Sequence, residues 1–178
     1  MNWISTVSGV QFHFLDPRAK EVVIEDIAHS LAWRCRFNGH TKVYYSIAQH
    51  SVLVAECLCE MFPNDRAIQL WGLLHDAAEA YLPDVPGPIK PYLRGFDALE
   101  ERILQVITAK YGLIYPPIAA VKLADRQALI IEGLVLFGRE IVETWEYKIT
   151  PPESIQLVPM TAEESKKAFL DKFNELTS

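Results

Sequence analysis

Apolar residues recur three and four residues apart along most of this chain, a spacing that places them on one side of an α-helix. The first such segment runs from Ile24 through Leu31 to Cys35 and stops before the turn signal Asn38-Gly39. Further helices are predicted from the N-cap Ser46 to Phe62, from Asn64 through Ala78, over 97–111 before Gly112, from Pro116-Pro117 toward Leu136, and over 161–177 behind a Thr161 and Glu164 capping box. The pattern predicts an all-α bundle of five to seven helices.

One short segment has a different period. From Trp3 to Phe14, apolar and polar residues alternate around Ser8-Gly9, which is typical of a β-hairpin with a glycine turn. The length of 178 residues fits one domain, without internal repeats or linkers. We therefore expect a single domain over 1–178, with the hairpin in 1–15, a helical core in 24–137 and a C-terminal helix in 161–177. Trp33 and Trp71 are predicted to lie in the core.

The charge balance restricts the partners of the protein. The formal net charge is −6, from 17 basic and 23 acidic residues, whereas a protein that coats duplex DNA or an anionic membrane needs a basic face. A small anionic ligand held by a few local cations remains compatible with that charge. No apolar run approaches the roughly 18 residues that cross a bilayer, and the first residues lack the features of a signal peptide. The three cysteines are an odd number, so we expect reduced thiols and a cytoplasmic location. From the charge and the lack of a long apolar run we expect no nucleic-acid or membrane partner.

The dipeptide His75-Asp76 is the first candidate for chemistry. It follows the apolar run from Leu70 to Leu74 and is expected to be buried in the middle of a helix. Aspartate is seldom buried unless it is paired or bound to a cation, so Asp76 requires a partner there. Glu79 lies four residues after His75 and three after Asp76, and so shares their helix face. This concentration of ionisable groups on one buried face indicates a functional site.

Two further residues offer matching ligands from other helices. His50 lies among apolar positions of the second helix, and Asp125 lies on the fifth. Two imidazoles and two carboxylates from three helices form a mixed nitrogen and oxygen site for a divalent transition metal, with positions open for water and substrate. The structural alternatives are a core histidine bonded to a backbone carbonyl for His50 and an ion pair with Arg126 for Asp125.

The order His50, His75-Asp76 and Asp125 resembles the signature of the HD-domain phosphohydrolase superfamily. The match covers about 26–129. The stretch HDAAEAYLPDVPGPIK, residues 75–90, is similar to bacterial 5′-deoxynucleotidases. The stretch RFNGHTKVYYSIAQHSVLVA, residues 36–55, is similar to their small bacterial and phage relatives, which include dATP triphosphohydrolases. The resemblance implies one HD domain with its catalytic core in 24–137, working in the cytoplasm of a bacterium or of a phage-infected host.

The resemblance also implies a role for each matching residue. The metal ligands would be His50, His75, Asp76 and Asp125, holding one divalent transition metal, which is Mn, Co or Zn, with Fe or Ni as alternatives. Glu79 would hold the attacking water or protonate the leaving oxygen, and Asp84 would orient substrate and water. The substrate phosphate would be bound by Arg36, with Lys90 as a second candidate and Lys42 as a weaker one. Phe37 stands where the deoxynucleotidases have Trp.

These roles imply hydrolysis at the α-phosphorus of a nucleotide, preferably a deoxynucleotide, with release of nucleoside together with phosphate or triphosphate. No histidine follows His75, which favours one metal ion over the two found in other HD proteins. The alternatives are a nucleotide sensor that keeps the metal site without turnover and a structural oligomerisation module. The expected partners are a small nucleotide and further copies of this chain in a homo-oligomer.

Overall fold

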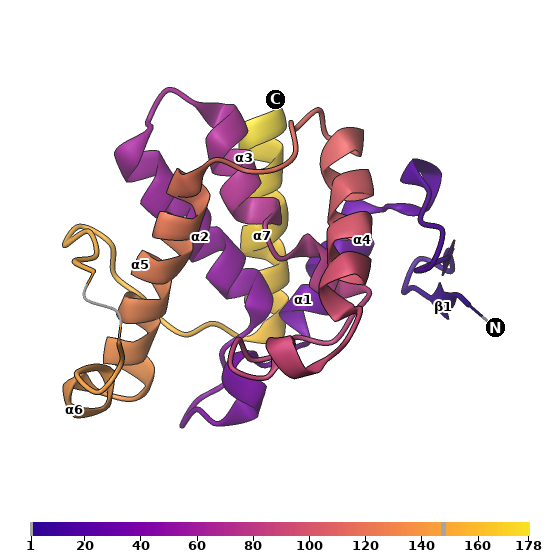
Figure 1. Cartoon of the computed structure of the whole chain (residues 1–178). Helices are drawn as coiled ribbons and strands as arrows, with labels where there is room; N and C mark the ends of the chain where they lie inside the picture. Colours follow the sequence, from indigo (N-terminus) through magenta and orange to yellow (C-terminus); the bar gives the residue numbers. More distant parts are fainter. Residues whose placement is uncertain (1, 147–148) are drawn as a thin grey trace.

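The computed structural model describes residues 2–146 and 149–178. Within them the chain forms seven α-helices and a two-stranded antiparallel hairpin, so the predicted all-α fold with a small N-terminal hairpin is confirmed (Figure 1). The helices are α1 (Ile24–Ala32), α2 (Ile47–Met61), α3 (Arg66–Leu74), α4 (Phe96–Lys110), α5 (Ala119–Leu136), α6 (Arg139–Val142) and α7 (Ala162–Thr177). Short 3₁₀ turns are η1 (Ala19–Glu21), η2 (Arg36–Gly39), η3 (Ala77–Ala80) and η4 (Lys90–Tyr92). Residue 1 of the predicted hairpin segment lies outside the described residues.

The N-terminal hairpin forms where the alternating pattern predicts it. Strands β1 (Ile4–Ser5) and β2 (Gln11–Phe12) pair antiparallel. Gly9 turns the chain between them at a φ of 86°, a conformation that favours glycine. Phe12 is fully buried and stacks on the ring of Tyr81, with the ring centroids 3.5 Å apart. The hairpin is therefore attached to the bundle by an aromatic contact.

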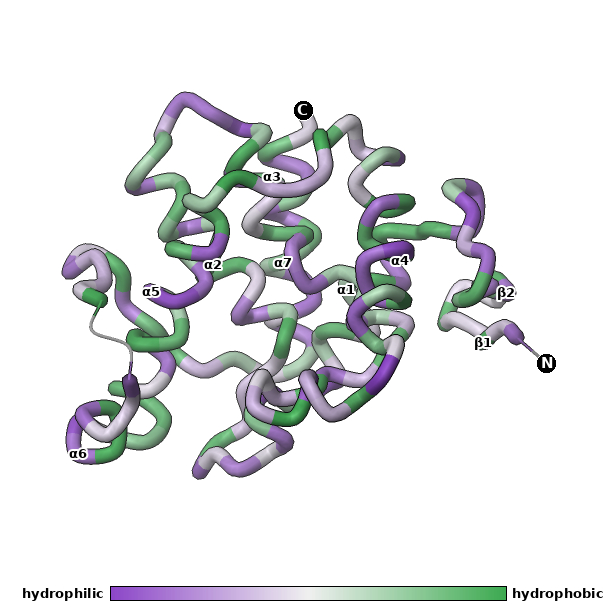
Figure 2. The backbone as a smooth tube through the Cα atoms, in the orientation of Figure 1, coloured by the Kyte–Doolittle hydropathy of each residue, from purple (hydrophilic) through white to green (hydrophobic). Residues whose placement is uncertain are grey.

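Helix α2 is the centre of the bundle, because α3, α5 and α7 all pack against it (Figure 1). Ser46 caps its N-terminus by accepting a hydrogen bond from the backbone N–H of Gln49, as predicted. Every residue from Ile47 to Leu58 except Glu56 is buried, so each polar side chain among them needs a partner inside the protein. Along the outer helices α4 and α7, hydrophobic and hydrophilic residues alternate instead (Figure 2), as in helices with one exposed face.

A tight helical hairpin brings the start of α2 beside the end of α3. The connection 62–65 is short, which makes the two helices antiparallel neighbours. Gly72 lies where they approach most closely, since a Cβ atom there would come within 3.2 Å of the Ala55 backbone. Antiparallel packing then puts His75, which follows α3, opposite the first turn of α2, where His50 lies.

Helix α1 ends earlier than the sequence pattern predicts. It stops at Ala32 instead of reaching Cys35, because the chain turns and the Arg36 N–H donates to the Tyr45 carbonyl oxygen at 2.9 Å. Cys35 is exposed as a result. The prediction that Trp33 lies in the core is also wrong, since this residue follows the last helical turn and is 46% exposed.

Helix α3 likewise stops at Leu74 instead of Ala78. His75 and Asp76 therefore lie at a break between α3 and η3, and the prediction that they lie in the middle of a helix is wrong. The His75 side chain donates from Nδ1 to the Gly72 carbonyl oxygen at 2.7 Å, and so uses an acceptor near the helix end that backbone N–H groups would otherwise use. Because of the break, the two side chains approach each other, with His75 Nε2 3.2 Å from Asp76 Oδ2, instead of lying along one helix face.

The remaining helices lie within three residues of their predicted bounds, and α7 has the predicted capping box between Thr161 and Glu164. The one-turn helix α6 has no counterpart among the predicted helices, because four residues are too few to show an apolar period. Trp71 is buried, as expected. Among the described residues, no helix is both long enough and apolar enough to span a lipid bilayer.

Candidate metal centre

Ligand atoms of the predicted metal-binding residues converge in one place. His50 Nε2 lies 3.2 Å from His75 Nε2 and 3.6 Å from Asp76 Oδ2. Asp125 Oδ1 lies 3.3 Å from His50 Nε2 and 4.0 Å from His75 Nε2. His75 Nε2 and Asp76 Oδ2 are 3.2 Å apart. The ligand atoms of His50, His75 and Asp76 all lie within 4.8 Å of one another, so these three side chains suit a single transition-metal ion, and Asp125 adds a carboxylate oxygen beside the two imidazoles.

The exposure of these ligands rises across the cluster. The side chain of His50, on α2, is fully buried, and that of His75 is 12% exposed. Asp76 is 23% exposed, and Asp125, on α5, is 40% exposed. The cluster is therefore closed on the side of α2 and open to solvent on the side of Asp125, where a small ligand can enter.

The second ring nitrogen of each histidine is bound to the protein. His75 Nδ1 donates to the Gly72 carbonyl oxygen at 2.7 Å, and His50 Nδ1 donates to Glu132 Oε1 at 2.6 Å. A carbonyl or carboxylate oxygen only accepts, so both Nδ1 atoms carry the proton and both Nε2 atoms turn toward the cluster. Metal-ligating histidines are held in this way in proteins generally.

The charges of the cluster favour a cation. Burial and the Arg36 guanidinium lower the pKa of His50, but Glu132 and Asp125 outweigh them and raise it to about 9. Burial alone would raise the pKa of Asp76, yet the neighbouring histidines hold it well below its usual range. The carboxylates therefore attract positive charge to the space between the ligands, and a divalent cation can supply it in place of protons.

Glu79 lies beside the cluster, on η3, and is only 3% exposed. Its Oε2 atom has no hydrogen-bond partner among the described residues. Burial, with the charges of Asp76 and Asp84, raises the pKa of Glu79, which favours the protonated form of its carboxyl. Buried polar atoms nearly always have a partner, and an unpartnered one next to a cation site fits a group that contacts water or substrate.

Asp84 and Lys90 lie on the same side of the cluster as Glu79. Asp84 is half-buried in the irregular segment 83–88, where burial raises its pKa and the Arg36 charge opposes that shift. Lys90 Nζ donates to both carboxylate oxygens of Glu100, at 2.9 and 3.1 Å, and lies 4.0 Å from Glu79 Oε1. The structure thus brings these three predicted residues together.

Arg36 reaches the cluster from η2. Its Nε donates to Glu132 Oε2 at 3.1 Å, and its side chain is 14% exposed. Burial alone would lower the pKa of Arg36, but the charges of Glu132 and Asp76 raise it. The guanidinium is therefore a permanent positive charge next to the candidate metal ligands.

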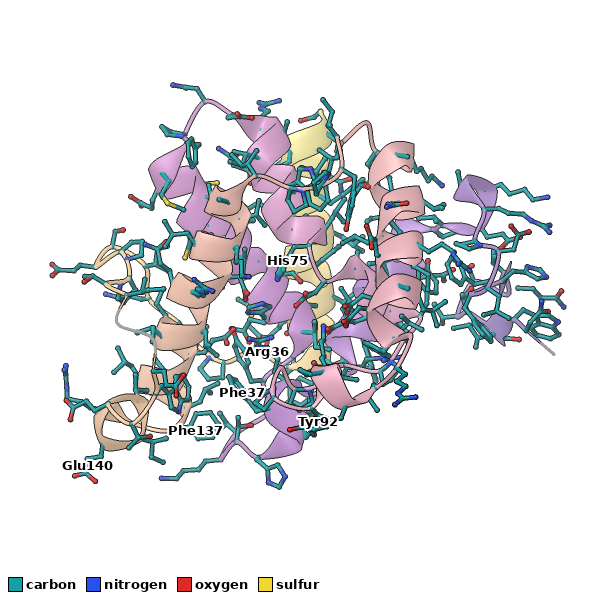
Figure 3. The ribbon with its side chains drawn as sticks, in the orientation of Figure 1. Arg36, Phe37, His75, Tyr92, Phe137 and Glu140 are labelled. Atoms are coloured by element: carbon teal, nitrogen blue, oxygen red, sulfur yellow. The ribbon has the colours of Figure 1, made fainter. Side chains whose placement is uncertain are left out.

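Phe37 continues from Arg36 through an unusual turn. Phe37 and Asn38 have φ angles of 54° and 50°, in the left-handed region that non-glycine residues rarely adopt. The Phe37 ring lies 5.1 Å from the Arg36 guanidinium carbon and 5.1 Å, edge to face, from the Phe137 ring. Figure 3 shows Arg36 and Phe37 below His75, with Phe137 next to Phe37. Strained backbone of this kind often occurs at functional sites.

Two further basic side chains, Arg34 and the predicted candidate Lys42, differ in position. Arg34 is half-buried, donates to the Leu82 carbonyl oxygen and lies close enough to Glu79 and Asp84 for their charges to oppose the lowering of its pKa by burial. Lys42 is exposed and forms no ion pair with any residue that the structure describes. Among the described residues, no hydrogen bond or ion pair links Lys42 to the cluster.

Glu132 is the functional candidate that the sequence analysis missed. It lies on α5, seven residues after Asp125 and so on the same helix face, and is fully buried. Burial alone would raise its pKa, but the charges of Arg36 and His50 lower it, so the carboxylate is ionised. The signal was present in the sequence, because Glu132 follows the apolar run 129–131 just as Asp76 follows the run 70–74.

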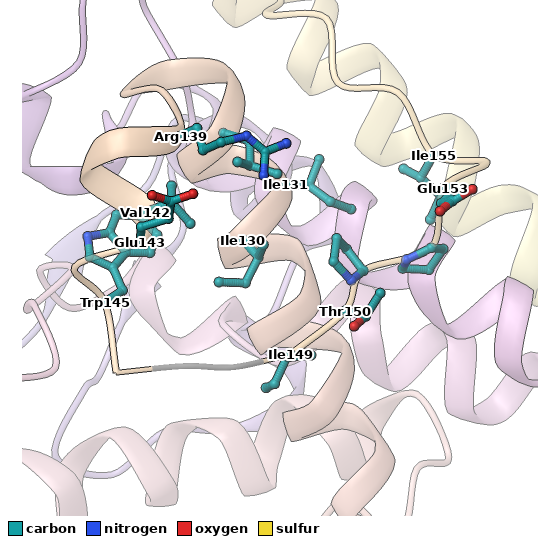
Figure 4. Close-up of a pocket in the computed structure, with 13 residues that line it drawn as sticks. Ile130, Ile131, Arg139, Val142, Glu143, Trp145, Ile149, Thr150, Glu153 and Ile155 are labelled. Atoms are coloured by element: carbon teal, nitrogen blue, oxygen red, sulfur yellow. The ribbon is translucent and has the colours of Figure 1, made fainter.

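A separate cavity of about 860 Å³ lies between α5, α6 and the segment 149–155 (Figure 4). Its lining includes Ile130, Val142, Trp145 and Ile155 and is mainly apolar. None of the candidate metal ligands is among the described residues that line it, so the cavity is not part of the metal centre.

Comparisons with known proteins relate the whole chain to others. It is 36% identical over 181 residues to the uncharacterized protein YfdR of Escherichia coli K12, and the match covers 99% of this chain and 97% of YfdR. It is also 36% identical over 144 residues to an uncharacterized protein of Rhodobacter capsulatus, with 76% of this chain and 74% of that protein covered. No family model matches the chain.

Proposed function

The chain belongs to the same family as YfdR of Escherichia coli, and for this member we propose a metal-dependent phosphohydrolase of the HD-domain type that acts on nucleotides. One observation carries the proposal. The ligand atoms of His50, His75 and Asp76 lie within 4.8 Å of one another, Asp125 Oδ1 lies 3.3 Å from His50 Nε2, and the second nitrogen of each histidine is bound elsewhere. The order of these ligands along the chain resembles the HD signature.

The ligand set suits one divalent transition metal, for which we propose Mn, Co or Zn, with Fe or Ni as alternatives. His50, His75, Asp76 and Asp125 would hold it. When bound, such an ion polarises a phosphoryl oxygen and activates water at neutral pH. His50 is fully buried, whereas Asp125 is 40% exposed. The substrate would therefore approach the metal from the side of Asp125.

Two cationic side chains would bind the phosphate. Among the described residues, the Arg36 guanidinium donates only through Nε–H, to Glu132, so its other four N–H groups would be available for phosphate oxygens. Lys90 Nζ, which is paired with Glu100, lies 4.0 Å from Glu79 Oε1. Both charges are local, which is why an acidic protein can bind an anionic nucleotide.

The protonation of Glu79 suits the leaving group. Burial favours the protonated form of its carboxyl, and Oε2 has no partner among the described residues, so this oxygen would protonate the departing 5′ oxygen. Asp84, half-buried nearby, would orient the attacking water. Water adds to the α-phosphorus as the bond to the 5′ oxygen breaks, which gives nucleoside and phosphate from a monophosphate, or nucleoside and triphosphate from a triphosphate.

The substrate class also bears on where the protein works. Nucleotides are cytoplasmic, and the three cysteines are free, in agreement with a reducing compartment. We therefore propose a cytoplasmic enzyme, in a bacterium or a phage-infected host, without nucleic-acid or membrane partners. We also propose that it forms a homo-oligomer, which light scattering of the purified protein measures directly.

A substrate panel tests the proposed function. Purified protein is loaded with Mn²⁺, Co²⁺ or Zn²⁺ and incubated with each deoxynucleoside monophosphate and triphosphate and with the ribonucleotide counterparts. We expect nucleoside to be released, and the co-product, phosphate or triphosphate, to show which phosphate class is used. Tight nucleotide binding without turnover with any metal would instead identify a sensor. A protein that binds none of these metals, and whose melting does not respond to a chelator, would be a structural module.

A further inference from the structure

Glu132 accepts hydrogen bonds from three different parts of the chain. Oε1 accepts from His50 Nδ1 at 2.6 Å and from the Tyr45 hydroxyl at 3.0 Å, and Oε2 accepts from Arg36 Nε at 3.1 Å. Its side chain is fully buried, as is that of His50. One carboxylate therefore contacts both a candidate metal ligand and the candidate phosphate-binding arginine, each through a different oxygen.

We propose that Glu132 is a positioning residue that couples metal binding to phosphate binding through His50 and Arg36. The inference rests on the proposed function. Through Oε1 the carboxylate keeps the His50 proton on Nδ1 and directs Nε2 to the metal. Through Oε2 it holds Arg36 by Nε, and neither terminal amino group of the guanidinium forms a hydrogen bond with Glu132.

The two histidines show why this role falls to one residue. His75 donates from Nδ1 to a backbone oxygen, that of Gly72, which is neutral and contacts no cationic side chain in the described hydrogen bonds. His50 donates to an ionised carboxylate that is shared with Arg36. A change at Glu132 thus alters the ligand and the arginine together, whereas a change near Gly72 alters one ligand only.

The variant Glu132→Gln keeps the size of the side chain but has a single acceptor oxygen. That oxygen can serve His50 or Arg36, while the amide NH₂ group faces the other donor. We expect the Co²⁺ affinity of the protein, measured by visible absorption without substrate, to fall about 10–100-fold, the range seen when the hydrogen-bond partner of a metal ligand is lost. We expect the affinity of the Co²⁺-saturated protein for inorganic phosphate to fall about tenfold.

A double-variant cycle separates positioning from general stability. If Glu132 acts on phosphate through Arg36, then adding Glu132→Gln to Arg36→Ala lowers the phosphate affinity by less than about twofold further. Asp26→Asn is the matched control. Asp26 is a carboxylate of the same burial class, 3% exposed, that accepts hydrogen bonds from Ser8 at the N-terminal hairpin. Its amide variant should lower the melting temperature and leave both affinities unchanged.

The proposal is overturned if Glu132→Gln folds but binds Co²⁺ and phosphate within threefold of wild type, or if its phosphate effect is undiminished beside Arg36→Ala. If Glu132→Gln does not fold, Glu132→Asp is used, since it keeps the charge but cannot reach both partners, and the same losses are expected. The wild-type protein decides the proposed function separately. A wild type that binds Co²⁺ and phosphate but turns over no nucleotide contradicts the enzyme and leaves the coupling measurable. A wild type that binds neither overturns both.

Discussion

Asp26 and Glu79 are equally buried in this bundle, each 3% exposed, but their surroundings differ. Asp26 on α1 accepts hydrogen bonds from the Ser8 backbone N–H at 2.9 Å and from the Ser8 hydroxyl at 2.7 Å, which anchors the hairpin. Glu79 keeps one oxygen without any partner among the described residues, and burial with the charges of Asp76 and Asp84 raises its pKa. A buried carboxyl that the chain itself satisfies stabilises the fold, and one that it leaves unsatisfied points to a ligand.

The variant Asp76→Ala should have the largest effect, because it removes a ligand of the candidate metal centre beside Glu79. We expect bound metal and turnover to be lost together, with activity falling by at least about 10³-fold. Metal analysis of the purified variant and the nucleotide assay measure this. Retention of stoichiometric metal with full activity would show that Asp76 is not a ligand.

Glu79→Ala tests whether the unsatisfied carboxyl serves the reaction and not the fold. We expect the variant to keep its metal and to lose about 10²–10⁴-fold in kcat, the usual contribution of a proton-transferring side chain. The free energy of unfolding should change by less than about 1 kcal/mol, since an oxygen without a partner contributes little to stability. Normal turnover by the variant would contradict the assignment of Glu79.

Lys90→Ala and Lys42→Ala test the predicted order of the two lysines as phosphate ligands, in which Lys90 ranks ahead of Lys42. Lys90 lies 4.0 Å from Glu79, so its loss should raise KM for the nucleotide about tenfold. Lys42 is exposed in the loop after η2, and its loss should change KM by less than about twofold. Steady-state kinetics at fixed ionic strength measure both. Equal effects would show that the phosphate lies nearer η2 than proposed.

Asp26→Ala should have the smallest effect on activity and a clear one on stability. The two Ser8 donors lose a charged acceptor, which costs about 1.5–3 kcal/mol and lowers Tm by roughly 3–12 °C. Metal content and kcat should match wild type, because Asp26 contacts none of the candidate ligands in the described hydrogen bonds. Calorimetry and the nucleotide assay on one preparation test this. A loss of metal in Asp26→Ala would contradict the distinction between Asp26 as a structural carboxyl and Glu79 as a functional one.

The sequence predicted most of the helices because their signal is local. An apolar period shows that residues such as Ile47, Val54 and Leu58 face a core, and Ser46 before them has the chemistry of an N-cap. The ends of α1 and α3 were predicted less well. Each is set by a contact with another residue, the Tyr45 carbonyl for Arg36 and the Gly72 carbonyl for His75, which an apolar period cannot reveal.

In the candidate site too, the sequence predicts some residues but not the contacts between residues distant in the chain. Asp76 was predicted because an aspartate after a buried apolar run needs a partner, and the same argument would have found Glu132 after 129–131. The sequence could not show that Glu132 serves His50 and Arg36 at once, since these residues lie 82 and 96 positions away. Nor could it show that Trp33 is exposed, because that follows from the early end of α1.

The amino-acid sequence by itself determined the helices, the hairpin and the types of ligand available, because backbone preferences and apolar periodicity act over a few residues. Only the tertiary structure decided which ligand atoms meet. The close approach of α2 and α3 at Gly72 places His50 beside His75, and the packing of α5 on α2 adds Asp125 and Glu132. A metal site needs atoms within a few ångströms, and that precision arises from packing between helices that are distant in the chain.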